Sequence, residues 1–231
     1  SEAREAILAR RRQAIGRTPD EQENAAARVG MRLAAPRPNL LPARGQVEGE
    51  AQVELFVRMA EAVRADVRRV PELGELPATV SAYLREHNLP QKLVMAPHPL
   101  LDAAGFESQP LLRVRRGTAN ETDEVGLTLA AAGIAETGTL MLASGPEQPP
   151  LLSFLPETCI VALPTEDIDG AYEQSWQRLR EALGAPPRSV NFVTGPSRTG
   201  DIGQKIEFGA HGPRRLLIVL VDRLPAEFQT G

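Results

Sequence analysis

The sequence predicts an α/β protein of three layers (α/β/α), in which helices cover both faces of one mainly parallel sheet. Continuous apolar segments alternate with segments of helical period along most of the chain. Strands that are apolar throughout are typical of parallel sheets buried on both faces. The chain has 231 residues, of which 42% are hydrophobic and 24% charged, so it is long enough and apolar enough to build a full core.

The first fifty residues are predicted to be a helical segment followed by a proline-rich connector. Apolar residues recur with helical spacing in residues 3–15, and a second, more polar helix is expected over residues 20–33. Three prolines between residues 35 and 43 then break the pattern, so residues from about 34 to 50 should be extended. We expect residues 1–50 to lie apart from a compact domain of residues 51–231, or to dock on a neighbouring subunit in a homo-oligomer. Removal of residues 1–45 should then leave a domain that folds cooperatively.

The compact domain is expected to alternate between helices and strands. Helices are predicted over residues 51–70, 77–89 and 168–184, with Gly184 as the C-cap of the last. A helical turn of small residues is expected between the strands near residues 125–129 and 139–143. The strands of the single predicted sheet are residues 92–97, 125–129, 139–143, 159–163, 189–194 and 215–221.

Composition and charge disfavour several classes of function. The net charge of −4 argues against a general affinity for nucleic acid or for an anionic membrane surface. The longest late apolar run, LLIVLV, is too short to insert into a membrane. The single cysteine, Cys159, can form neither an internal disulfide nor a four-thiolate cluster. Because the start of the chain is charged and shows no signal peptide, we expect a cytoplasmic protein.

One candidate site is the segment GPSRTGDIGQKIEFGAHGP, residues 195–213, which follows a predicted strand. Ligands of open α/β sheets bind at the carboxyl ends of strands. A helix that starts after this turn would offer free amides and a positive dipole end to an anion, and Arg198 would add a bidentate contact. The segment thus predicts a cradle for a small anionic ligand. Its predicted ligand-binding residues are Gly195, Ser197, Arg198, Thr199, Asp201 and His211.

Two other interpretations of this segment stand beside the anion cradle. Residues 195–199 nearly match the nucleophile elbow G-x-S-x-G, which would make Ser197 a nucleophile backed by Asp201 and His211. In that fold the acid and the histidine arrive on later strands, whereas only one strand remains here, so a catalytic triad is disfavoured. Alternatively, the hydroxyls merely cap a helix, and Asp201 with Gln204 resembles a capping box.

The second candidate site is the turn ETGT, residues 136–139, directly before a buried strand. A buried carboxylate must be paired or must face a cleft. Glu136 is therefore predicted either as a catalytic nucleophile or general base, or as a group that bonds the amides of its own loop. Thr137, Gly138 and Thr139 complete this ligand-binding turn.

A third feature is LLSFLPETCIV, in which Ser153 and Glu157 precede a strand and Cys159 is expected to be a buried small hydrophobe. The histidines are scattered along the chain without ligand spacing, so the sequence predicts no metal site. No cofactor is evident, since neither glycine-rich phosphate-binding motif occurs.

Three segments in this order, GIAETGTL, SFLPETCIV and GPSRTGDI with FGAHGPRRLLIVLVD, resemble the LUD domain. More narrowly they resemble the lactate-utilisation protein C (LutC/YkgG) family, over about residues 120–222. The resemblance implies a fold similar to the NagB/RpiA/CoA-transferase superfamily. It also implies a role in bacterial oxidation of L-lactate to pyruvate, beside iron–sulfur partner proteins. Gly203 stands where the family often has an acidic residue and Pro150 where it often has an arginine, so the ligand need not be the same.

Three functions are compatible with these residues. The first is an accessory or regulatory component of organic-acid oxidation that binds a small anion or a partner. The second is an enzyme acting on a carboxylate, CoA thioester or phosphosugar, with Glu136 as acid–base group or nucleophile. The third is a non-catalytic scaffold subunit.

Overall fold

The computed structural model describes residues 2–35, 40–184, 186–202, 205–209 and 212–229, without the side chains of residue 19 and residues 199–208. The chain divides into two compact units, Ser1–Leu40 and Leu41–Gly231. The first unit contains two helices, α1 (Glu2–Ile15) and α2 (Pro19–Ala34). No helix of the described residues is long and apolar enough to cross a membrane.

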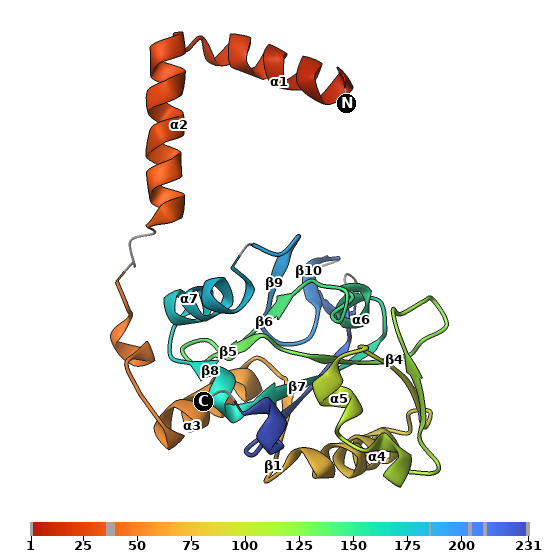
Figure 1. Cartoon of the computed structure of the whole chain (residues 1–231). Helices are drawn as coiled ribbons and strands as arrows, with labels where there is room; N and C mark the ends of the chain where they lie inside the picture. Colours follow the sequence, from red (N-terminus) through yellow and green to blue (C-terminus); the bar gives the residue numbers. More distant parts are fainter. Residues whose placement is uncertain (1, 36–39, 185, 203–204, 210–211, 230–231) are drawn as a thin grey trace. The chain divides into compact units, whose positions relative to one another are not determined.

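The second unit is organised around a six-stranded sheet in which every neighbouring pair of strands is parallel (Figure 1). The strand order is β1-β12-β7-β4-β2-β3. The strands are β1 (Asp66–Val70), β2 (Lys92–Met95), β3 (Arg113–Arg116), β4 (Val125–Leu129), β7 (Thr158–Pro164) and β12 (Arg215–Val221). The predicted α/β fold with a mainly parallel sheet and flanking helices is confirmed.

Two neighbouring strands inside the sheet, β7 and β12, are buried on both faces. All residues of β7 are buried, and alternate side chains belong to different hydrophobic clusters. Ile160 and Leu217 point into one cluster, whereas Val161 and Ile218 point into the other. This alternation follows from the two-residue period of a strand.

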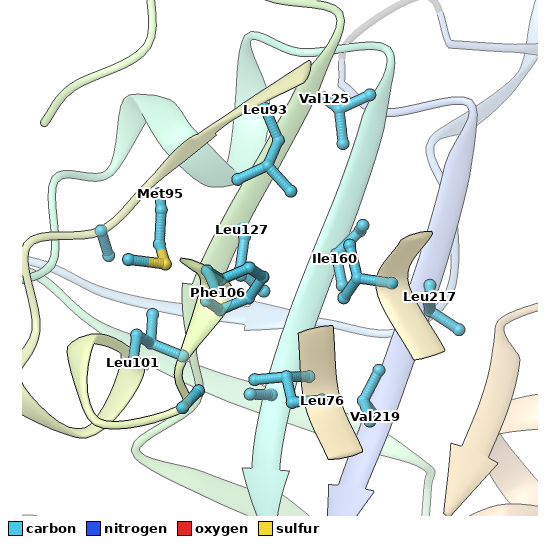
Figure 2. Packing of buried hydrophobic residues seen from close by; sticks show 14 of the residues in the cluster. Leu76, Leu93, Met95, Leu101, Phe106, Val125, Leu127, Ile160, Leu217 and Val219 are labelled. Carbon is cyan, nitrogen blue, oxygen red and sulfur yellow. The ribbon is translucent and has the colours of Figure 1, made fainter. Parts of the chain in front are cut away.

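The first face is covered by α4 (Leu76–Glu86), the short helix α5 (Pro99–Asp102) and two 3₁₀ turns, η2 (Leu73–Glu75) and η3 (Phe106–Ser108). Figure 2 shows Leu76, Leu101 and Phe106 in one hydrophobic cluster with Leu127, Ile160 and Leu217 of the sheet. These side chains are almost completely removed from water, so this face holds a large share of the hydrophobic stabilisation.

The second face is covered by α3 (Glu50–Ala62) and by a four-stranded sheet rather than by helices alone. Its order is β8-β5-β6-β9, and α7 (Tyr172–Leu183) packs on its outer side through Leu179 (Figure 1). These strands are β5 (Ala132–Ile134), β6 (Thr139–Ala143), β8 (Ile168–Asp169) and β9 (Val190–Val193). The remaining elements are α6 (Leu151–Phe154), the antiparallel hairpin β10 (Arg198–Ile202) with β11 (Lys205–Phe208), and the 3₁₀ turns η1 (Ala43–Gly45), η4 (Thr165–Asp167) and η5 (Ala226–Phe228).

The prediction of one continuous sheet is wrong, because residues 139–143 and 190–193 belong to the second sheet. There β6 is antiparallel to both of its neighbours, β5 and β9. The predicted helical turn of small residues is in fact β5. A Cβ on Gly133 would lie 2.7 Å from Leu163 Cδ2, so the small residue lets β5 pack closely on the central sheet.

The predicted helix over residues 51–70 ends early, and its last residues form a strand. Val63 caps α3, and Arg64 adopts a left-handed φ of 69°, which interrupts the helix. Residues 66–70 then pair with β12, because the open edge of the parallel sheet satisfies their backbone groups. The helix after residue 168 ends as predicted at Gly184, whose φ is 63°.

Replacing Gly138 with Ala should destabilise the protein strongly. Gly138 has a φ of 64°, and a Cβ there would lie 2.6 Å from Ala60 Cα and would overlap the α3 backbone. Gly184→Ala is the matched control, because Gly184 has a φ of 63° and no atom within 4 Å of the added Cβ. We expect the control to lose about 1–2 kcal/mol of unfolding free energy, from the left-handed backbone alone. Gly138→Ala should lose clearly more in urea titrations; equal losses would contradict the close packing of this turn on α3.

Candidate functional site

The two turns singled out in the sequence meet at the end of α3. The turn containing Gly138 packs on the backbone of residues 59–60, the last turn of that helix. Gly195, with a φ of 76°, packs on Val63, the residue that caps it, and a Cβ there would lie 3.1 Å from Val63 Cβ. Both positions need glycine for its positive φ and for this close approach. Segments almost sixty residues apart in the sequence are thus brought to one place.

A network of hydroxyl groups joins these turns directly. Thr139 Oγ1 lies 2.7 Å from Thr194 Oγ1 and 2.7 Å from Thr137 Oγ1. The hydroxyl of Tyr172, at the start of α7, lies 3.2 Å from Thr137 Oγ1 and 3.1 Å from Thr139 Oγ1. Thr139 is buried and Thr194 is exposed, so the network extends from the interior to the surface. The Tyr172 ring also contacts Phe192, with 5.2 Å between ring centroids.

Glu136 is buried, with 4% of its surface exposed, and is paired with Arg44. Arg44 Nε donates to Glu136 Oε2 at 3.3 Å, while the Arg44 side chain as a whole is 63% exposed. Of the two expectations for a buried carboxylate at this position, pairing or exposure to a cleft, the structure shows the pairing. The pair leaves the guanidinium within reach of solvent, where it has further N–H groups to donate.

Two glycines hold Arg44 beside Glu136. The carbonyl of Gly170 accepts a hydrogen bond of 3.0 Å from Glu136 N. The backbone of Gly45 packs on this same residue, since a Cβ on Gly45 would lie 2.8 Å from Gly170 O. The segment after the proline-rich connector is therefore part of the domain's packing, and the adjacent Arg44 is fixed in position by it.

A second charged cluster supports β8, the strand that precedes Gly170. Arg178 donates to Asp169 Oδ1 at 2.9 Å and to Asp167 Oδ1 at 3.1 Å. Ser175 Oγ adds a bond of 2.9 Å to Asp169 Oδ2. Because Asp169 O accepts from Ala135 N at 2.8 Å, this cluster stabilises the backbone directly before Glu136.

No helix begins among the described residues of the predicted anion cradle. Gly195 is followed by β10, which starts at Arg198 and pairs with β11 as an antiparallel hairpin. The nearest helix end that contacts this turn is the carboxyl end of α3, where the macrodipole is negative and disfavours an anion. The pairing of β10 with β11 replaces the expected strand-to-helix turn, and it also removes the geometry of a nucleophile elbow.

The structure describes only some of the predicted ligand-binding residues of the segment 195–213. Arg198 is exposed, and Ser197 N donates to Pro213 O at 2.8 Å while Ser197 O accepts from Gly209 N at 2.9 Å. Thr199 and Asp201 lie in β10, with side chains outside the described ones, and His211 lies outside the described residues. Their role as ligand contacts stays a prediction.

The third sequence feature lies elsewhere. Ser153 is buried in α6 and lines a cavity of about 10 Å³, next to the hydrogen bond of 2.7 Å between Thr128 Oγ1 and Gln148 Oε1. Burial raises the pKa of Cys159 to about 12, so its thiol stays protonated and unreactive. Among the described residues, no three His, Cys, Asp or Glu side chains are grouped as metal ligands.

Sequence reasoning missed Arg44, Tyr172 and Thr194 as neighbours of the predicted turn. Arg44 lies in the segment that was expected to be an extended connector. A buried Glu136 was expected to be paired or to face a cleft, so a cationic partner could be anticipated from the sequence. The sequence could not identify which of the many arginines that partner is. No local sequence pattern indicated that Tyr172 and Thr194 lie beside this turn.

The free energy of unfolding should depend on pH through Asp167. Burial, together with the charges of Glu166 and Asp169, raises the pKa of Asp167 to about 6 against the attraction of Arg178. The folded state then binds a proton more tightly than the unfolded state, so this group's contribution to stability increases as the pH falls from about 7 to about 4. Asp167→Asn should remove that contribution in urea titrations at the two pH values. An unchanged pH dependence would contradict it.

The stability of an N-terminally truncated chain should depend on whether the truncation removes Arg44 and Gly45. A chain starting at residue 41 keeps the Arg44–Glu136 pair and should unfold cooperatively. A chain starting at residue 46 lacks Arg44 and the packing of Gly45, and leaves a buried carboxylate without its cation. We expect it to be less stable by about 1–3 kcal/mol. Equal urea midpoints for the two chains would show that the connector does not stabilise the domain.

Comparison with known proteins agrees with this architecture. The family model described as LUD domain matches residues 53–221. An uncharacterized protein of Neisseria meningitidis is 36% identical over 109 residues, covering 46% of this chain and 47% of that protein. Lactate utilization protein C of Anoxybacillus flavithermus is 35% identical over 106 residues, and that of Geobacillus kaustophilus 34% over 118 residues. They cover 46% and 49% of this chain, and 47% and 49% of the relatives.

A solved structure has the same fold. The crystal structure of a DUF162 family protein from Deinococcus radiodurans aligns with a TM-score of 0.57 at 21% identity, covering 76% of this chain and 99% of that one. The curated relatives above are matched over only about half of their length. The family model, in contrast, extends across both sheets and both turns of the candidate site. The chain belongs to the LUD domain family, and it is similar within that family to lactate utilization protein C.

Proposed function

We propose that the protein is a component of lactate utilisation and that it binds a small carboxylate ligand at the turn of residues 136–139. The names of the curated relatives support the role in lactate utilisation. The pairing of buried Glu136 with the largely exposed guanidinium of Arg44 carries the proposal for the site. Arginine suits a carboxylate because its planar fork of donors can bind both oxygens.

The charge balance of the pair favours binding over catalysis. Glu136 neutralises Arg44 in part and fixes its direction through Nε, which leaves the other two nitrogens for a ligand. A nucleophile or general base would need an accessible carboxylate, whereas Glu136 is almost fully buried. In this proposal Glu136 positions the cation and does not touch the ligand.

The hydroxyl network supports a ligand that carries a second oxygen. Thr137 follows Glu136 directly and is partly accessible, as is Tyr172, to which it is bonded. A hydroxyl group can donate or accept, so this pair can contact either the hydroxyl of lactate or the carbonyl of pyruvate. The proposed ligand is therefore a small 2-hydroxy or 2-oxo acid. Iron–sulfur proteins of lactate oxidation are the partners proposed for it.

Isothermal titration calorimetry with L-lactate, pyruvate and propionate tests the site. Propionate keeps the carboxylate and lacks the oxygen at C2, so it should bind more weakly than the other two. Arg44→Ala in a Glu136→Gln background removes the cation without leaving a buried charge. Loss of a charged hydrogen-bond partner costs about 1.5–3 kcal/mol, so we expect the affinity for lactate to fall about tenfold or more relative to Glu136→Gln alone.

Arg58→Ala is the matched control, since its side chain is 64% exposed and lies on the neighbouring helix α3. It should leave the affinity unchanged. Arg198→Ala tests the cation predicted from the sequence, and we expect a smaller effect than at Arg44 because Arg198 is exposed on a hairpin strand. If Arg44→Ala leaves lactate binding intact in this background, the proposed site is wrong. If Glu136→Gln abolishes turnover of a substrate that still binds, the enzymatic alternative is correct.

A further inference from the structure

Three aromatic side chains gather beside the proposed ligand site, on the outer side of the second sheet. Phe192 of β9 is the cross-strand partner of Met141 of β6, and Met141 packs in one cluster with Leu179 and Trp176 of α7. Cross-strand partners point to the same face of a sheet, so Phe192 faces α7. Its ring centroid lies 5.2 Å from that of Tyr172 and 5.6 Å from that of Trp176. Phe192 is nevertheless 38% exposed, so its ring is held by two neighbours and open to solvent.

Tyr172 joins these rings to the hydroxyl groups of the proposed site. Its hydroxyl lies 3.2 Å from Thr137 Oγ1 and 3.1 Å from Thr139 Oγ1, while its ring contacts Phe192. Thr194 comes two residues after Phe192, and its Oγ1 lies 2.7 Å from Thr139 Oγ1. The hydroxyl network and the aromatic rings are therefore adjacent parts of one surface, with Tyr172 belonging to both.

The chemistry of the proposed ligand determines which part of it meets these rings. C2 of a 2-hydroxy acid carries a carboxylate, a hydroxyl group, a hydrogen and a side chain. In the proposed site the carboxylate contacts Arg44, and the hydroxyl group contacts Thr137 and Tyr172. The side chain is attached to the same carbon, so it would lie beside the Tyr172 ring. In lactate this side chain is a single methyl group, which covers little of the aromatic surface.

We propose that the site takes 2-hydroxy and 2-oxo acids with larger apolar or aromatic side chains, and that Phe192 determines this preference. The inference rests on the proposed function, because it uses the same contacts to the carboxylate and to the oxygen at C2. An aromatic ring on the ligand would pack against Phe192 and Tyr172, which adds attraction between rings to the burial of apolar surface. Met141 and Trp176 beside Phe192 offer no cation to a second carboxylate, so a diacid such as malate is disfavoured.

Isothermal titration calorimetry of the full chain with L-lactate, L-3-phenyllactate and L-malate tests the inference. Phenyllactate is lactate with a phenyl ring on its methyl group, and we expect it to bind about tenfold more tightly. Malate should bind no more tightly than lactate. Phe192→Ala should reduce the ratio of the lactate and phenyllactate dissociation constants to about twofold or less. A merely structural role of Phe192 would weaken both ligands alike and leave this ratio unchanged.

Phe154→Ala is the matched control, because Phe154 is 37% exposed and lies on α6, and it should keep the ratio of the parent chain. Phe192→Leu keeps an apolar side chain and should give an intermediate ratio, also where the alanine variant does not fold. In the Glu136→Gln background, Arg44→Ala should weaken phenyllactate as it weakens lactate, since both use one site.

The outcomes separate this inference from the proposed function. If lactate binds and phenyllactate binds no more tightly, or if Phe192→Ala leaves the ratio unchanged, the inference is wrong and the proposed function stands. Phenyllactate binding that survives the loss of Arg44 in the Glu136→Gln background also overturns the inference, because the rings would then belong to a separate site. If neither acid binds, both are wrong.

Discussion

Burial of β7 and β12 on both faces is the constraint on which the rest of the second unit depends. Every side chain of β7 is withdrawn from water, and the strands on either side of this pair are parallel to it. A parallel strand needs a crossover connection, and an apolar strand needs cover above and below. The other elements serve these two needs: each either connects one parallel strand to the next or covers one face of the central sheet.

The two faces meet this requirement differently, and the difference creates the site. Helix α4 and its neighbouring turns cover one face, while α3 shares the other with a small sheet. Because β5 and β6 lie flat on the central sheet, the turn between them is pressed against the end of α3. Only glycine at position 138 allows that contact. The residues on either side of it, Glu136 to Thr139, are thereby held in one arrangement.

The pairing of Glu136 with Arg44 follows from the cost of removing a carboxylate from water. Glu136 enters the interior with the turn and is paired there with Arg44, which comes from a segment over ninety residues earlier. Arg44 stays largely in water, so this interaction costs less desolvation than a fully buried pair would. In the proposed site, Arg44 would hold the carboxylate of the ligand from its accessible side, and the buried Glu136 would position Arg44.

The sequence by itself determined the class of fold, because apolar runs too continuous for a half-exposed sheet require a parallel one with cover on both faces. It also determined the two helices of the first unit and the cap at Gly184, which are properties of neighbouring residues. Only the tertiary structure decided the division into two sheets, since β6 of the second sheet is as apolar as β4 of the first. It alone made residues 66–70 a strand, where the free edge of β12 outweighs a helical period. It alone placed Arg44 at Glu136 and joined Thr139 to Thr194, because a salt bridge or hydrogen bond between distant segments depends on how the layers stack, and no local pattern records that.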